Sequence, residues 1–412
     1  MSGLSSTEAW RWTYDRRAKR KSLSSLPILP LVAAIFFVLT FLIKALVDDA
    51  FTRGVVSSTI AYTKYITAAI ACLAALGYAL KHGEHLFVRE FNRLVIILVV
   101  FTVVSFAFQV TSSYFSTSVL IELVKLAMPA LLAYAMLNAL SPKALYRCMV
   151  GVLLVSMLGY LLTLIHDGIG FSDIMASDFA NSESASESST FSGIFLVLTL
   201  YFAFFRQNKV WLVLSSLFCI ITFKRLAIVA VLFALVVSFF APRLMRVEAP
   251  RGAIVTLKLL TIVAAALWTW MLLPEQQALF IQLLGDTPSH FSMGRSDVLA
   301  YLVNSGFQSY GFGSANEVAK AVFAAPFEMD LTKIAIELTP VVMVAFVWLF
   351  WDVAGTSLWG VIIIGYFMVN MITSDSLTSN FCLTLAYMTC GLVTQSCSCY
   401  SFKKAGRDDD AR

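Results

Sequence analysis

Long apolar runs separated by short polar segments extend along the chain from residue 26 to residue 398. A helix of about 20 apolar residues crosses the hydrocarbon core of a bilayer, which is roughly 30 Å thick. The pattern therefore predicts an all-α polytopic transmembrane bundle with about twelve spans. The predicted ranges are 26–46, 59–80, 94–110, 118–140, 148–166, 191–206, 210–223, 226–241, 253–273, 331–351, 357–373 and 380–398.

Two longer polar segments interrupt this pattern. Residues 167–190 are rich in serine and acidic residues and contain no Lys or Arg, which is typical of a mobile surface loop. Residues 274–330 separate the ninth and tenth predicted spans and carry Gly, Pro and aromatic residues. A loop of this length in a compact bundle is usually functional or disordered. Its aromatic and apolar content favours ordered structure, with a short helix expected around 297–303.

The composition agrees with lipid as the main solvent of the chain. Hydrophobic residues make up 59% of the sequence and charged residues 13%, whereas about a quarter of a typical soluble domain is charged. The basic stretch from Arg16 to Lys21 precedes an apolar run too long for a signal-peptide core, so we expect that run to remain as a membrane helix. The seven cysteines lie in or beside apolar runs, a placement that does not imply disulfides.

The distribution of Lys and Arg predicts the orientation in the membrane, because cytoplasmic loops carry an excess of both. With the N-terminus inside, segments on the cytoplasmic side hold 20 of the 30 Lys and Arg residues and those on the other side hold five. We therefore expect cytoplasmic tails at 1–25 and 399–412, and outer positions for 167–190 and 274–330. No dense basic block with interleaved aromatics is present, so nucleic-acid binding is not expected.

Lys224 and Arg225 are adjacent cations at the predicted outer end of the hairpin between the seventh and eighth spans. This position opposes the positive-inside bias, and a cation at membrane depth costs about 2.5–3.5 kcal/mol on insertion scales. Such a pair requires an anionic partner, for which a phosphate group is the natural candidate. The alternative is that both side chains snorkel to water and merely end the hairpin.

Other charges within the predicted spans show a related bias toward the outer half of the membrane. Such a bias predicts a polar cavity that opens outward, with Lys258 alone near the inner face. Charges three or four residues apart share a helix face, so internal ion pairing is an equally open interpretation. The outer set is Lys44, Lys64, Lys333 and Glu337, together with Glu122 and Lys125.

Arg295 lies in the long outer segment, where Met293-Gly294-Arg295 precedes a short helical pattern. A guanidinium group stays charged and can bind a phosphate or pyrophosphate through two parallel hydrogen bonds. Taken alone, an arginine in a loop is usually a solvated surface residue.

In these features the chain resembles the O-antigen polymerases of the Wzy type and the related O-antigen ligases. The shared features are many spans with one large late outer loop, a basic pair opening a span at Lys224-Arg225, and an Arg-x10-Gly pattern from Arg295 to Gly306, followed by Gly311-Phe312-Gly313. The layout covers most of the chain, but the specific motifs cover only about 222–230 and 293–338. Many relatives place a His-Asn pair where this chain has Met329-Asp330, which puts a histidine-dependent step in question.

The resemblance implies an enzyme of the bacterial inner membrane that needs no cofactor or metal. It would transfer a glycan from undecaprenyl pyrophosphate to a sugar hydroxyl of another lipid-linked repeat unit at the periplasmic face, with a chain-length regulator protein as a further partner. The expected catalytic residues are Arg225 and Arg295 for the diphosphate, and Asp297, Asp330 and Glu337 as candidates to orient or deprotonate the acceptor hydroxyl. The expected substrate-binding residues are Lys224, Gly294, Gly306, Gly311, Gly313 and Lys333.

Two other functions remain open from the sequence. A lipid-linked oligosaccharide flippase would also need many spans and a cationic cavity, but transporters usually bind near the bilayer midplane and contain internal repeats, and no repeat is apparent in the chain. An O-antigen ligase would share the chemistry and differ only in the acceptor.

Overall fold

The computed structural model describes residues 27–82, 85–170, 173, 188–205, 208–242, 244–377 and 379–409. Within these residues the fold is helical, and β-structure is limited to an isolated bridge between Glu248 and Ser357. The predicted tail 1–25 and most of the predicted polar loop 167–190 lie outside the described residues. The prediction of an all-α fold is confirmed for the described part of the chain.

Each predicted apolar run overlaps a helix of the structure. Helices α5 and α7 begin six residues before the predicted starts at 94 and 148, because Arg89 and Lys143 continue the helix beyond its apolar part. The helices of the bundle are α2 (Ile28–Thr52), α3 (Ser58–Ala61), α4 (Thr63–His82), α5 (Val88–Ser112), α6 (Thr117–Ala139), α7 (Pro142–His166), α9 (Ser189–Phe205), α10 (Lys209–Ile221), α11 (Arg225–Phe240), α12 (Arg251–Met271), α17 (Asp330–Glu337), α18 (Pro340–Trp351), α19 (Leu358–Thr373) and α20 (Asn380–Asp409).

The bundle presents apolar side chains to its surroundings. Leu73, Val103 and Phe240 are 70%, 61% and 85% exposed, and many other large apolar residues are similarly open. A water-soluble monomer rarely exposes so much contiguous apolar surface. Among the residues that the structure describes, six helices are long and apolar enough to cross a membrane: α2, α4, α5, α6, α7 and α12. These features indicate a membrane protein.

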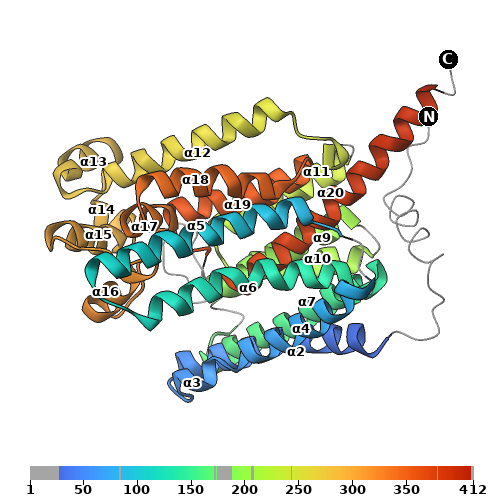
Figure 1. Cartoon of the computed structure of the whole chain (residues 1–412), viewed down its shortest axis with the longest axis horizontal. Helices are drawn as coiled ribbons and strands as arrows, with labels where there is room; N and C mark the ends of the chain where they lie inside the picture. The colour runs from blue at the N-terminus through green and yellow to red at the C-terminus, as the bar shows by residue number, and fades with distance from the viewer. Residues whose placement is uncertain are drawn as a thin grey trace.

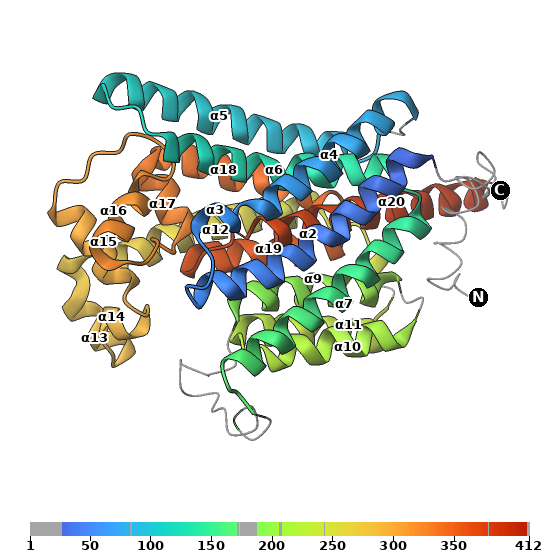
Figure 2. The same ribbon diagram turned by 90° about the horizontal axis from the view of Figure 1, so that it is seen from below.

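Helix α9 and the N-terminal part of α20 lie in the interior of the bundle, whereas the C-terminal part of α20 projects from it (Figures 1 and 2). Helix α9 packs against α10, α11 and α20, and α20 also packs against α6. Every residue from Ile194 to Phe205 is buried. At Gly193 an added Cβ would lie 2.8 Å from the sulfur of Cys382, so this glycine lets α9 and the first turn of α20 approach closely.

The tenth predicted run, 331–351, is two helices rather than one. Helix α17 ends at Glu337 and α18 begins at Pro340. Proline has no N–H to donate to the preceding turn, and its ring collides with the carbonyl four residues earlier, so it ends a helix and is readily accepted at the start of the next. The hydroxyl of Thr339 caps the new helix by accepting a hydrogen bond from Val342 N at 3.2 Å.

The long segment 274–330 is ordered, as its composition predicts. It contains the short helices α13 (Gln277–Leu284), α14 (Pro288–Phe291), α15 (Arg295–Asn304) and α16 (Ser314–Phe323). Helix α15 confirms the short helix expected around 297–303. These elements share an apolar cluster that includes Phe280, Leu299 and Phe327. They form a cap at the end of the bundle opposite the C-terminal end of α20 (Figure 1).

Candidate functional site

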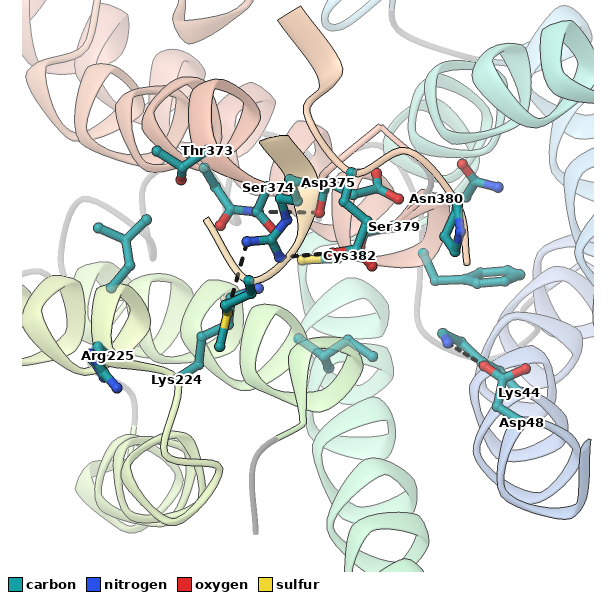
Figure 3. A pocket seen from close by; sticks show the side chains of 18 of the residues that line it. Lys44, Asp48, Lys224, Arg225, Thr373, Ser374, Asp375, Ser379, Asn380 and Cys382 are labelled. Atoms are coloured by element: carbon teal, nitrogen blue, oxygen red, sulfur yellow. Dashed lines mark hydrogen bonds and ion pairs between the residues drawn. The ribbon is translucent and has the colours of Figure 1, made fainter. Parts of the chain in front are cut away.

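A cavity of about 960 Å³ lies where the cap segment meets the bundle. Its walls come from α2, α4, the start of α11, the cap segment and the connection between α19 and α20. The Lys and Arg distribution predicts an outer position for these segments. The volume is at the upper end of the roughly 300–1,000 Å³ range of small-molecule sites. Figure 3 shows the side chains that line it.

Lys224 and Arg225 reach the cavity because a tight turn precedes them. Helix α10 ends at Ile221, and Phe223 adopts a left-handed backbone (φ 53°) that reverses the chain. Helix α11 then begins at Arg225, with no side chain capping its N-terminus. The first N–H groups of a helix have no intrahelical partner and carry partial positive charge, so this end of α11 adds to the field of the two cations.

Arg295 lines the same cavity from the cap segment. Gly294, with φ 79°, precedes it and lets the chain turn into α15. The guanidinium donates to the carboxylate of Glu328 at 2.8 Å, and its side chain is 20% exposed. Its Nε–H is buried without a hydrogen-bond acceptor. Lys224 and Arg225 therefore line the same cavity as Arg295, which lies 70 residues after Arg225 in the chain.

Lys44 on α2 and Lys64 on α4 line another side of the cavity. Both contact the carboxylate of Asp48, the first at 2.5 Å. Their side chains are 13% and 14% exposed. A polar cavity lined by Lys44 and Lys64 is therefore present, and internal ion pairing accounts for part of its charge.

The connection between α19 and α20 supplies polar groups that the sequence analysis did not single out. Ser374, Asp375, Ser379 and Asn380 all line the cavity. The signal in the sequence is weak, because Ser-Asp-Ser-Leu-Thr-Ser-Asn between two apolar runs resembles an ordinary turn. Figure 3 places these residues between Lys224 and Arg225 on one side and Lys44 and Asp48 on the other, with Arg225 at the edge of the group.

Three carboxylates expected at the site do not line the cavity. Asp297 accepts a hydrogen bond from the hydroxyl of Ser289 within the cap segment. Asp330 and Glu337 are 1% and 0% exposed and bond to backbone groups of neighbouring loops. Their positions in the sequence suggested proximity to Arg295. The folding of α17 into the bundle buries Asp330 and Glu337, whereas Asp297 lies exposed on α15.

The predicted substrate-binding residues other than Lys224 also lie away from the cavity lining. Lys333 is 1% exposed and its ammonium lies 4.8 Å from the centre of the Phe312 ring. Gly311 and Gly313 have φ values of 125° and 101° and pack against α5 and α6, where an added Cβ would lie 3.0 Å from Ser105 and 2.8 Å from Glu122. The remaining two, Gly294 and Gly306, have open space around them and serve as turns.

The two predicted ion pairs have different outcomes. Lys125 contacts Glu122 at 2.9 Å, so pairing along this face of α6 is confirmed. The expected Lys333–Glu337 ion pair does not form as a direct contact. The two oxygens of Glu337 instead accept hydrogen bonds from Gly313 N and Ala315 N, each at 2.7 Å. Glu337 therefore caps α16, where a negative charge is stabilised by the helix dipole.

His290 and Asp286 form a further pair on the cap side of the cavity, at 2.5 Å. The hydrogen bond that the protonated His290 ring donates to the Asp286 carboxylate raises the pKa of His290, and the same bond lowers the pKa of Asp286. The His290 side chain is 77% exposed, so solvent screens this interaction. No motif in the sequence points to His290, and its place beside the cavity follows only from the fold.

The cavity can therefore hold an anionic group against fixed cations and offer it hydrogen-bond donors. Five lysine and arginine residues line it together with four carboxylates, and two of those carboxylates, Asp48 and Glu328, contact cations of the lining. Among the residues that the structure describes, no three His, Cys, Asp or Glu side chains gather closely enough to hold a metal ion. Comparisons of the chain with protein-family models, with curated proteins and with solved structures found no match.

Proposed function

We propose that the chain is a bacterial inner-membrane glycosyltransferase that polymerises lipid-linked glycan repeat units at the periplasmic face. The observation that carries this proposal is the convergence of Lys224, Arg225 and Arg295 on one cavity at the end of an apolar helical bundle. These are the cations that the resemblance to O-antigen polymerases nominates for the diphosphate.

The proposed reaction uses the energy of the donor bond. The acceptor hydroxyl attacks the anomeric carbon of the donor glycan, and the bond from that carbon to the diphosphate oxygen breaks, leaving undecaprenyl pyrophosphate. Negative charge then develops on the diphosphate, and fixed cations in a water-poor site stabilise such charge without reorganising. Arg295 and Arg225 would bear this role, with Lys224 assisting.

The environment of Arg295 supports a phosphate ligand. Its two terminal nitrogens donate to Glu328 and to Ser292 O, while the Nε–H lacks an acceptor. An unsatisfied buried donor costs about 1–3 kcal/mol, and a phosphate oxygen would supply the missing acceptor after a small rotation of the side chain. The exposed Arg225 forms no salt bridge or side-chain hydrogen bond with the described residues, so its charge is available to a ligand.

The position of the cavity favours a transferase over a flippase. A flippase would carry its cargo through a site near the middle of the bundle, with similar access from both ends. The lining here comes from helix ends and from the cap segment. A cap of this kind suits a reaction that occurs on glycans outside the membrane while the lipid tails remain in the bilayer.

The decisive experiment is elongation by the purified protein in lipid nanodiscs. The substrate would be undecaprenyl-pyrophosphate-linked repeat units accumulated by cells that lack this protein, supplied without nucleotide. We expect a ladder of longer glycans and release of undecaprenyl pyrophosphate, both measured by mass spectrometry. Movement of the repeat unit across proteoliposomes with no ladder would favour the flippase, and transfer only to a lipid A acceptor would favour the ligase.

A further inference from the structure

We infer that Asp375 is the group that accepts the proton of the acceptor hydroxyl, and that buried Asp330 positions it. This inference rests on the proposed function. It assigns the carboxylate that the reaction needs to a residue of the α19–α20 connection, which lines the cavity, in place of the three candidates that lie outside it.

Asp330 forms hydrogen bonds with the backbone on both sides of Asp375. Its Oδ2 accepts hydrogen bonds from Ser376 N at 2.6 Å and from Leu377 N at 2.8 Å. Its own N–H donates to Ser374 O at 3.3 Å. Asp330 is the first residue of α17, so the segment that follows Arg295 and Glu328 in the chain fixes the loop that carries Asp375.

Asn370 provides a second restraint from α19. Its Nδ2 donates to the hydroxyl of Ser376 at 2.5 Å and to Asp375 O at 3.3 Å. The backbone of Ser374 in turn donates to Asn370 O at 2.7 Å. Asp330, Asn370 and Ser376 are all nearly inaccessible, while Asp375 is half-buried and faces the cavity. Such a loop holds its carboxylate in one place, as an efficient proton acceptor requires.

The location of Asp375 fits the geometry of the transfer. Figure 3 shows it among the loop residues between the cations of α11 and those of α2. With the donor diphosphate held at Arg225 and Arg295, an acceptor hydroxyl that approaches from the loop side meets Asp375. Glu328 and Asp48 line the same cavity and contact Arg295 and the two lysines. Asp375 is distinguished from them by the buried hydrogen bonds that hold its loop.

The step balances without a further reactant. As a lone pair of the hydroxyl oxygen forms the new bond to the anomeric carbon, the carboxylate of Asp375 takes the hydroxyl proton. The electron pair of the broken bond stays on the diphosphate oxygen. The protonated Asp375 then returns its proton to water after the products leave.

The test is Asp375→Asn in nanodiscs with the lipid-linked repeat units described above. General-base catalysis contributes about 10²–10⁴-fold, so we expect kcat to fall about 100-fold or more. Binding of geranylgeranyl diphosphate, used as a probe of the cation site, should not weaken, because the substitution removes a negative charge beside the cations. In the wild-type protein the rate should fall at low pH as the carboxylate is protonated, and we call this part of the pH–rate profile the acid limb. The acid limb should disappear in Asp375→Asn. Asp375→Glu should recover part of the rate and keep the acid limb.

Asp330→Ala tests the positioning role. It should lower kcat, leave binding of geranylgeranyl diphosphate unchanged and move the apparent pKa of the acid limb, which a loss of stability alone would not do. The matched control is Asp297→Asn, a carboxylate outside the cavity, which should retain the wild-type rate and pH profile. A wild-type rate and acid limb in Asp375→Asn would overturn this inference and leave the proposed function standing. Failure of the wild-type protein to form a ladder would overturn both.

Discussion

Two groups of polar residues that the sequence nominates for the same site have different surroundings in the fold. Lys224, Arg225 and Arg295 line a large cavity. Lys333 and Glu337 lie at the junction of α16 and α17, at 1% and 0% exposure. Both groups lie in or beside apolar runs, and both carry charge into a setting where charge is costly.

The difference lies in how each charge is compensated. At the α16–α17 junction the carboxylate of Glu337 is satisfied by two backbone N–H groups, so its role is complete within the protein. At the cavity, Arg225 has no such compensation from the described residues, and Arg295 retains an unsatisfied N–H. A charge whose partners are internal stabilises the fold, whereas an incompletely compensated charge beside a cavity points to a ligand.

The sharpest test of this comparison is removal of the cavity arginines. Arg295→Ala and Arg225→Ala should each lower elongation by about 100-fold or more, because electrostatic stabilisation of the leaving group is lost. Thermal unfolding in detergent should hardly change. The control is Arg251→Ala, since Arg251 opens α12 as Arg225 opens α11 but at the other end of the bundle. Wild-type ladders from either cavity variant would contradict the comparison.

Replacing Glu337 should lower the stability of the protein and leave binding at the cavity unchanged, the opposite of what is expected for the cavity arginines. Glu337→Gln leaves an amide donor facing one of two backbone donors, at a cost of about 1–3 kcal/mol for the buried group left unsatisfied. We expect a lower midpoint of thermal unfolding, followed by tryptophan fluorescence, and unchanged binding of geranylgeranyl diphosphate by the folded fraction. A variant with wild-type stability that no longer binds this diphosphate would assign Glu337 to the site.

The glycines provide a smaller test within the same junction. Gly313→Ala should destabilise the protein, because its φ of 101° suits only glycine and an added Cβ would lie 2.8 Å from Glu122 Cγ. Gly306→Ala shares the positive φ but meets nothing within 4 Å, so its cost should be the backbone term of about 1 kcal/mol alone. Equal midpoints of thermal unfolding for the two variants would argue against close packing at Gly313.

The smallest expected effect concerns pH at the cap. The pKa of His290 is raised above its ordinary 6.5, so the stability from its pairing with Asp286 is fully present below 6.5 and is lost as pH rises through the raised value. The pKa of Asp286 is lowered below 3.8, so on the acid side the contribution is lost only as pH falls through that lowered value. Hydrogen exchange of the α14 amides, corrected for intrinsic rates, should show less protection at pH 8 than at pH 6. Asp286→Asn should remove this difference.

Much of the architecture could be predicted from local pattern, because the thickness of a bilayer sets the length of each apolar run and short-range periodicity sets its type. The ordered cap and the short helix at α15 followed from composition in the same way. The break between α17 and α18 was missed although Thr339-Pro340 signals it, since the apolar content of the run outweighed the proline.

By itself the sequence determined that this chain is a helical membrane protein and that unusual cations stand at particular helix ends. Tertiary structure alone decided which of those cations meet in one cavity, that Glu337 caps α16, and that Asp330 grips the loop of Asp375. Hydrophobic periodicity is a property of neighbouring residues. A cavity and the compensation of its charges arise from segments that can be more than 200 residues apart in the chain and that packing brings together. The role of a charged residue in such a bundle therefore depends on what the fold places beside it.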